Sequence, residues 1–198
     1  MSSRQDIRRR MRAKRRSLSP RERADAAARM AGALLTHPLY RGARRIAAYL
    51  PADGEMDPVP LMERAWLMGK SVYLPVLVPF GHNRLWFAPY RPGDRLVANC
   101  FGIAEPQIVH RGRIAATGLD LVLAPLVAFD PEGHRLGMGG GYYDRSFAFL
   151  RRRRAWRKPR LVGVAYAFQQ VSALPAQPWD VPLTAIATDA GVLRCTAL

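Results

Sequence analysis

The residues with the clearest chemical potential lie between Arg135 and Arg145, in the string RLGMGGGYYDR. Glycine occupies four of the five positions from Gly137 to Gly141. Such a run costs conformational entropy, but it lets the backbone approach a ligand closely and lets several N–H groups face one anion. The two arginines would add charge suited to phosphate oxygens, and Asp144 could hold a magnesium ion bound to those phosphates. The string therefore predicts a phosphate-binding loop, with a plain flexible turn as the alternative.

The spacing of these glycines differs from two familiar phosphate-binding motifs. Tyr142 and Tyr143 stand where a Walker A loop has Gly-Lys, and Tyr142 also falls on the third glycine of G-x-G-x-x-G. Spacing alone thus predicts an anion-binding loop without naming its ligand.

A buried strand and a helix are expected to position the loop. The preceding run, Leu121–Phe129, is apolar and is broken only by Pro125, a pattern typical of a strand buried on both faces. Asp130–Gly133 carries turn residues, and the segment after the glycines is amphipathic as far as Leu150. A helix that begins after the glycines would direct its positive N-terminal end at the anion.

The rest of the chain alternates predicted helices and strands. Ser19-Pro20-Arg21-Glu22 combines an N-cap, a proline at the first helical position and a capping-box glutamate. Helices are expected over Ser2–Arg16, Pro20–Leu35 and Pro58–Lys70, and strands over Arg45–Leu50, Ser71–Val78, Leu85–Tyr90, Arg160–Phe168 and Ala185–Leu193. This alternation predicts an α/β fold, a three-layer α/β/α sandwich with a mainly parallel sheet. Asn99–Ala116 is expected to be irregular, and residues 1–198 are expected to form a single domain.

The composition is that of a globular protein with a large excess of positive charge. Hydrophobic residues make up 49% of the 198 residues, which argues against disorder, and the net charge is +16. Much of this charge lies in two clusters, Arg8–Arg16 and Arg151–Arg160. The charge is compatible with a nucleic-acid or acidic-membrane surface, with an ordinary arginine-rich surface, or with polyanionic substrates.

Cysteine usage and hydropathy indicate the setting of the protein. Cys100 and Cys195 form no C-x-x-C motif, so neither a zinc site nor a disulfide framework is expected. We therefore expect a reducing, cytoplasmic setting. No apolar run approaches the roughly 18 residues that span a bilayer, so no membrane association is expected. The basic N-terminus is not followed by the apolar region of a secretory signal.

The full string R-L-G-x-G-x-G-Y-Y-D, after an apolar strand that ends in Phe-Asp, closely resembles the signature of a known family. This is the 5-formyltetrahydrofolate cyclo-ligase family, whose members are also called methenyltetrahydrofolate synthetases. The resemblance implies the conversion of 5-formyltetrahydrofolate and ATP to 5,10-methenyltetrahydrofolate, ADP and phosphate. It also implies Mg²⁺ as a cofactor and a cytoplasmic monomer that acts on small molecules and has no specific nucleic-acid partner.

The resemblance also assigns roles to individual residues. ATP contacts are implied for two segments: Arg4, Gln5, Asp6, Ile7 and Arg8, and then Arg135, Leu136, Gly137, Met138, Gly139, Gly140, Gly141, Tyr142 and Tyr143. Contacts with the folate are implied for Leu50, Glu55, Met138 and Tyr142, magnesium contacts for Asp144 and Asp180, and catalytic roles for Arg135, Tyr143 and Asp144. Arg4 stands where the family frequently has lysine. Taken from the residues alone, Glu55 and Asp144 could instead be first-turn carboxylates that favour a helix dipole.

The C-terminal third follows the family pattern with two departures. The matching positions are Gly163, Ala165, Gln169, Leu174, Pro175, Asp180, Thr188 and Gly191. Trp179 stands where family members often have histidine, and Thr184 where they often have aspartate. These departures leave open a relative that keeps the nucleotide site but has a changed substrate, and the charge leaves open a nucleic-acid-binding protein.

The nucleic-acid alternative can be separated from the enzyme by salt dependence. A dedicated nucleic-acid-binding protein would bind tightly, with a steep salt slope, and would remain bound at physiological salt. For a folate enzyme we expect only weak association that salt screens easily. Fluorescence anisotropy with labelled DNA and RNA at two salt concentrations measures this, and tight binding at the higher concentration would contradict the expectation.

Overall fold

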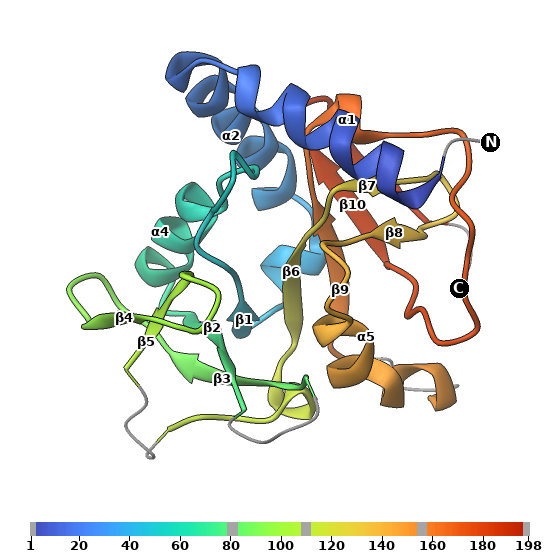
Figure 1. Ribbon diagram of the computed structural model, residues 1–198. Coiled ribbons are helices and arrows are strands. Elements are labelled where there is room, and N and C mark those ends of the chain that lie inside the picture. The colour runs from blue at the N-terminus through green and yellow to red at the C-terminus, as the bar shows by residue number, and fades with distance from the viewer. Residues whose placement is uncertain (1–2, 79–82, 108–111, 154–157, 196–198) are drawn as a thin grey trace.

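The computed structural model describes residues 3–78, 83–107, 112–153 and 158–195 (Figure 1). Its α-helices are α1 Arg4–Ser17, α2 Pro20–Leu35, α3 Pro38–Arg41, α4 Val59–Leu67 and α5 Tyr142–Phe147. Its strands are β1 Arg45–Ala47, β2 Ser71–Leu77, β3 Leu85–Pro89, β4 Leu96–Ala98, β5 Ala104–Pro106, β6 Leu121–Pro125, β7 Ala128–Phe129, β8 Arg135–Leu136, β9 Arg160–Val164, β10 Ala185–Thr188 and β11 Gly191–Arg194. Short 3-10 turns are η1 Ala116–Gly118, η2 Ala148–Arg152 and η3 Ala167–Gln169.

A seven-stranded sheet in the order β11-β10-β9-β6-β1-β2-β3 forms the centre of the fold. The five inner strands pair in parallel, and the edge strands β3 and β11 pair antiparallel to their neighbours. Two small antiparallel pairs, β4 with β5 and β7 with β8, lie beside it. The predicted α/β fold with a mainly parallel sheet is therefore confirmed. Pro89 is the last residue of the edge strand β3, a position where proline is tolerated in sheets.

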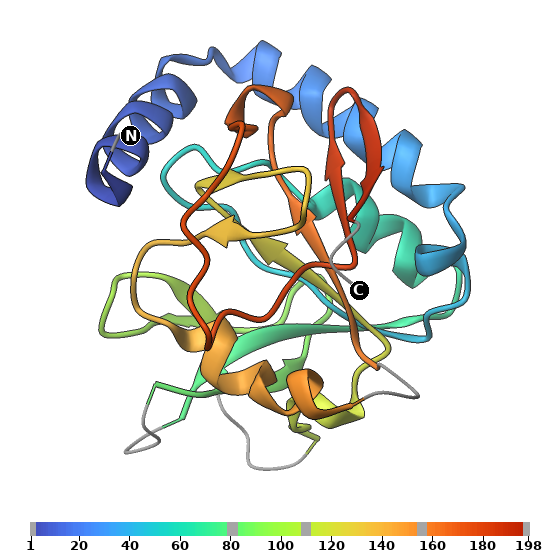
Figure 2. The ribbon, with the colours of Figure 1, turned by 90° about the vertical axis from the view of Figure 1, so that its right-hand side faces the viewer.

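Alternating side chains of the inner strands enter two separate cores. Leu121 and Leu123 of β6 pack in the core under α2, α3 and α4, whereas Val122 packs in the core on the opposite face with Phe147 of α5. Because a strand reverses its side-chain direction at every residue, an apolar run of this kind requires cover on both faces. Figure 2 shows the two layers on either side of the sheet, with the α5 layer much the shorter.

The N-terminal helices begin at well-formed caps. Ser19 and Glu22 form the predicted capping box of α2, with proline in its first turn. An equivalent box, formed by Ser3 and Asp6, starts α1. Ile7 and Met11 of α1 pack in a third cluster with Val127, Ala128 and other residues, so α1 lies across β7 rather than against the main sheet (Figure 1).

The predicted strand Leu121–Phe129 is shorter than expected. Its sheet part ends at Pro125, and its last two residues pair with β8 as a separate hairpin. Proline lacks the N–H that would continue a ladder. Beyond Pro125, the side-chain amide of Gln169 donates hydrogen bonds to the carbonyl oxygens of Leu126 and Val127, at 2.9 and 2.8 Å, where a neighbouring strand would otherwise pair.

Several other element boundaries also differ from expectation. The region Asn99–Ala116, expected to be irregular, contains β5 paired with β4, and its positions 108–111 lie outside the described residues. The predicted closing strand Ala185–Leu193 is a hairpin of β10 and β11. Positions 154–157 of the second basic cluster also lie outside the described residues. Within the described ranges, none of the helices is both long and apolar enough to cross a membrane.

Candidate active site

The candidate site lies where the connections of two neighbouring parallel strands leave the sheet in opposite directions. Strand β1 continues through α4, which packs on one face, and β6 continues through α5, which packs on the other. A crevice opens at the carboxyl ends of strands at such a switch point, and ligands bind there in open α/β sheets. The segments that follow these two strands, Tyr49–Glu55 and Leu126–Val127, both line a cavity at this point.

The cavity has a volume of about 380 Å³, within the usual range for small-molecule sites. Strands β2 and β3 and the β4–β5 hairpin supply an apolar wall, which includes Leu74, Leu77, Leu85, Phe101 and Ile103. Charged lining residues come from α1, β8 and the segment before β10, and together with the glycine loop they form a charged wall, which includes Arg4, Arg8, Arg135 and Asp180. The site can therefore accept a molecule that has both an anionic and an aromatic part.

The glycine loop connects β8 to α5 and lines the cavity along its whole length. Gly139 has a φ of 108° and Gly141 a φ of 66°, values that L side chains rarely adopt. A Cβ at Gly141 would also lie 2.5 Å from the guanidinium of Arg145, which itself donates to the Gly140 carbonyl at 2.6 Å. Glycine is thus required where the loop leads into α5, and the hydrogen bond from Arg145 to the Gly140 carbonyl stabilises the loop.

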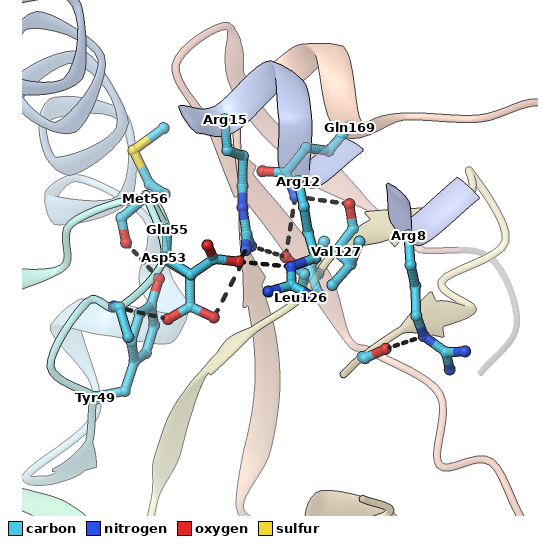
Figure 3. A network of polar contacts seen from close by, with 12 residues as sticks. Arg8, Arg12, Arg15, Tyr49, Asp53, Glu55, Met56, Leu126, Val127 and Gln169 are labelled. Atoms are coloured by element: carbon cyan, nitrogen blue, oxygen red, sulfur yellow. Dashed lines mark hydrogen bonds and ion pairs between the residues drawn. The ribbon is translucent and has the colours of Figure 1, made fainter. Parts of the chain in front are cut away.

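Two arginines of α1 enter the cavity from its first turns. The Nε of Arg8 donates to the Gly137 carbonyl at 2.8 Å, which fixes its guanidinium beside the loop (Figure 3). Arg4 donates to the Pro175 carbonyl and to Asp180, at 2.9 and 3.3 Å. Burial, and then the neighbouring charge of Arg4, lower the pKa of Arg8 from its ordinary value. This end of the cavity therefore favours an anion.

Two carboxylates lie at the same charged end. Asp144 accepts from Arg135 and from the Val181 backbone N–H on its Oδ1, and Asp180 accepts from Arg4 and from the Gln177 backbone N–H on its Oδ2. Arg135 is nearly buried, at 7% exposure, and also donates to the Val181 carbonyl. Within the described ranges, the other oxygen of each aspartate accepts no hydrogen bond, so each is available as a hard oxygen ligand for a cation.

Glu55 reaches the cavity from the loop after β1. Its Oε2 accepts from the Ala52 backbone N–H at 3.2 Å, and its Oε1 lies 3.9 Å from the buried guanidinium of Arg15 (Figure 3). Burial is the largest influence on the Glu55 carboxyl and raises its pKa, while Arg15 acts in the opposite direction. Burial, and then Glu55, also raise the pKa of Tyr143, so this hydroxyl remains a hydrogen-bond donor at neutral pH.

The structure brings together most of the residues singled out from the sequence. The cavity is lined by Arg4, Arg8, Leu50, Glu55, Arg135, Leu136, Gly137, Met138, Gly139, Gly140, Gly141, Tyr142, Tyr143, Asp144 and Asp180. Gln5, Asp6 and Ile7 do not line it: Asp6 caps α1 and Ile7 packs in the core. They lie between Arg4 and Arg8, which are one helical turn apart and so share a face.

Sequence reasoning missed several lining residues. The cavity is also lined by Tyr49, Asp53, Phe101 and Glu105. Trp179, which stands where family members often have histidine, lines it as well. Tyr49 and Asp53 could have been found, because both flank Glu55 after a strand. Phe101 lies in a region expected to be irregular, where it packs edge-on against Tyr142 with ring centroids 5.9 Å apart.

Comparison with known proteins identifies the family of this site. The sequence profile of the 5-formyltetrahydrofolate cyclo-ligase family matches residues 1–189. The chain belongs to this family. Over 184 residues it is 41% identical to the 5-formyltetrahydrofolate cyclo-ligase of Escherichia coli K12, and this match covers 92% of this chain and 98% of that protein. Over 145 residues it is 43% identical to the cyclo-ligase of Haemophilus influenzae, covering 72% and 74% of the two chains.

Solved structures agree with this cyclo-ligase assignment. The 5,10-methenyltetrahydrofolate synthetase of Aquifex aeolicus is similar, with a TM-score of 0.80 and 34% identity, covering 98% of this chain and 93% of that one. The synthetase of Mycoplasma pneumoniae, at 24% identity and a TM-score of 0.72 over 95% of this chain and 99% of that one, supports the fold. The resemblance of the RLGMGGGYYD string to the cyclo-ligase signature is thus confirmed.

The loop that carries Glu55 gives a prediction about stability. Gly54 has a φ of 69°, and a Cβ there would lie 3.0 Å from the backbone oxygen of Arg15, whereas Gly69 has a φ of 68° and open space around it. Gly69→Ala should cost about 1–2 kcal/mol for the left-handed backbone alone. Gly54→Ala should cost clearly more and should also impair activity. Denaturant unfolding measures both variants, and equal losses would show that the loop does not depend on its close approach to α1.

Proposed function

We propose that this protein converts 5-formyltetrahydrofolate and ATP to 5,10-methenyltetrahydrofolate, ADP and phosphate. The observation that carries the proposal is a single cavity lined by the RLGMGGGYYD loop, by Arg4 and Arg8, and by Glu55. Membership of the cyclo-ligase family supports the same conclusion. The apolar and charged walls of the cavity match a folate and a nucleotide, respectively.

The proposed reaction explains why the cavity needs no nucleophile of its own. A formamide carbon is a poor electrophile, but transfer of the γ-phosphoryl group to its oxygen makes that oxygen a leaving group. N10 of the folate then attacks this carbon, which closes the five-membered ring, and N10 gives up its proton to solvent or to the phosphate. The C–O bond breaks and phosphate departs. The protein must therefore align the two substrates, neutralise the phosphoryl charge and exclude water.

The charged wall would bind the phosphates. Backbone N–H groups of Gly137–Gly141 and the guanidinium groups of Arg4 and Arg8 would neutralise the phosphoryl oxygens. Arg135 contributes charge in the cavity wall and, through its ion pair with Asp144, holds that carboxylate beside the loop. Because these donors are fixed before the substrate arrives, little reorganisation is needed as charge develops.

The folate would bind along the apolar wall and against lining residues of the loop after β1, the glycine loop and the start of α5. The carboxylate of Glu55 can accept hydrogen bonds from N–H groups of the pterin, and Leu50 and Tyr142 supply apolar surface beside it. Met138 lines the cavity, is 55% exposed and can cover an aromatic ring. The hydroxyl of Tyr143, which remains protonated, can donate to the formyl oxygen or to the phosphoryl group that it receives.

Asp144 and Asp180 fit a magnesium ion by their chemistry. Both carboxylates line the charged wall, and each keeps one oxygen free of hydrogen bonds within the described ranges. Carboxylates together with substrate phosphates are the ligands that Mg²⁺ commonly takes. When bound there, the ion would neutralise charge on the transferring phosphoryl group. Their present partners, Arg135 and Arg4, orient both carboxylates.

The proposal extends to the setting of the enzyme. We propose a cytoplasmic monomer in which residues 1–198 form a single domain. The free thiols of Cys100 and Cys195 support a reducing compartment.

The decisive experiment is a turnover assay with purified protein, ATP, Mg²⁺ and 5-formyltetrahydrofolate. We expect the absorbance of the methenyl product to appear, together with one ADP for each molecule formed, and ATP hydrolysis to depend on the folate. ATP hydrolysis at the same rate without folate would indicate a different enzyme. The absence of the methenyl product at every substrate concentration would exclude the proposed reaction.

Asp144→Asn tests the proposed metal contact. The change removes the ion pair with the nearly buried Arg135, so we expect stability to fall by about 1–3 kcal/mol and turnover to fall far more steeply. Added magnesium should restore part of the turnover, and Asp180→Asn should behave in the same way. Asp25→Asn is the control, because that carboxylate is 61% exposed on α2 and does not line the cavity. Wild-type magnesium dependence in Asp144→Asn would remove Asp144 from the metal site.

A further inference from the structure

Arg15 lies in the last turn of α1, and its side chain is completely buried, which is unusual for an arginine. Its Nη2 lies 3.1 Å from Asp53 Oδ2, and its Nη1 lies 3.4 Å from the Leu126 carbonyl oxygen and 3.9 Å from Glu55 Oε1 (Figure 3). Its Nε has no hydrogen-bond partner among the described residues. A buried guanidinium with an unsatisfied donor is costly for folding, so its retention calls for another reason.

The three groups that Arg15 contacts come from the two segments that frame the cavity. Asp53 and Glu55 belong to the loop after β1, and Leu126 follows β6. The Leu126 carbonyl also accepts from Gln169, at 2.9 Å, so its position is fixed from two sides. Arg15 therefore joins the opposite sides of the switch point, and does so beneath the cavity rather than within its lining.

The loop that Arg15 contacts has a strained backbone. Asp53 has a φ of 50° and Gly54 a φ of 69°, two consecutive residues in the left-handed region. Arg12 and Arg16 also pair with Asp53, the first at 2.7 Å through its Nε. Three arginines of α1 thus hold one aspartate, while only Arg15 among them also forms an ion pair with Glu55.

We propose that Arg15 is a positioning residue for the folate site: its buried guanidinium pairs with the Glu55 carboxylate and holds it directed into the cavity, against the fixed carbonyl of Leu126. The inference rests on the proposed function, in which Glu55 recognises the pterin. Arg15 touches neither substrate, and it acts through the orientation and charge of Glu55. Arg12 and Arg16 keep the loop attached to α1 through Asp53, so the role of Arg15 is separable from theirs.

The charges around Glu55 set the sign of the expected pH effect. Arg12 and Arg15 approach from α1, Asp53 from its own loop, Tyr49 from the end of β1 and Tyr143 from α5. Burial favours the neutral carboxyl and Arg15 favours the carboxylate. Removal of the Arg15 charge therefore raises the pKa of Glu55 further, so that protonation of Glu55 weakens folate binding at a higher pH than in the wild type.

The test compares Arg15→Gln with the matched control Arg16→Gln, which removes the same charge from the same aspartate without an ion pair to Glu55. For Arg15→Gln we expect kcat/KM for 5-formyltetrahydrofolate to fall about tenfold at the acid end of the pH profile and to recover as pH rises. A tenfold change corresponds to the pKa shift of about one unit that loss of an opposite charge at about 4–6 Å can cause. The KM for ATP should stay near the wild-type value. Arg16→Gln should keep the wild-type profile, and identical profiles for the two variants would overturn the inference.

Arg15→Lys provides an independent variant if Arg15→Gln does not fold. Lysine keeps the positive charge but lacks the planar fork that reaches Asp53, Glu55 and Leu126 together. We expect the acid limb of the profile to stay in place while the KM for the folate rises several-fold. A wild-type KM for the folate in Arg15→Lys would overturn the positioning role.

A direct titration separates this inference from the proposed function. NMR of ¹³C-carboxyl-labelled glutamate follows the ionisation of Glu55 without substrate, and its resonance is assigned by its loss in Glu55→Gln. We expect the Glu55 midpoint to lie at higher pH in Arg15→Gln than in the wild type and in Arg16→Gln. An unchanged midpoint would overturn the inference even in an active enzyme, whereas failure of the wild-type turnover assay would overturn the proposed function alone.

Discussion

The parallel pairing of β1 with β6 is the constraint on which the site depends. Ile46 and Ala47 lie beside Leu121 and Val122, so the segments that follow these strands emerge at the same edge of the sheet. Their helices, α4 and α5, must then cover opposite faces, because each face exposes apolar side chains. The two segments that follow these strands therefore diverge beyond the carboxyl ends of β1 and β6, and the cavity lies between them.

Helix α1 completes this cavity from outside the sheet. It lies across β7 and supplies Arg4 and Arg8 at one end and Arg12, Arg15 and Arg16 at the other. The first pair faces the glycine loop, and the second group holds the loop that carries Glu55. One helix thus contacts both the glycine loop and the loop that carries Glu55, and so fixes the distance between the two sites that we propose for the nucleotide and the folate.

The large positive charge of the chain acquires a partial explanation from this arrangement. Of the three interpretations left open by the net charge of +16, polyanionic substrates agree with the arginines that line the cavity. Other arginines serve the structure: Arg15 is buried against Asp53, and Arg145 supports the glycine loop. Arg9 is mostly exposed and, in the part of the chain that the structure describes, forms an ion pair only with Asp6 on its own helix, which is typical of an ordinary solvated surface.

The sequence by itself determined the α/β class, the capped helices and the residues of the glycine loop, because these depend on local signals: apolar runs, caps and glycine spacing. It also placed Glu55 and Asp144 at the ends of strands or beginnings of helices. The pairing of Ala128–Phe129 with β8 and the β4–β5 hairpin were decided by the tertiary structure, since strand pairing is not specified by local signals. The same holds for Arg15, which in sequence is one of many arginines in a basic helix. Only the packing of α1 against the loop after β1 buries it, and burial gives its charge an effect on Glu55 that it would not have in water.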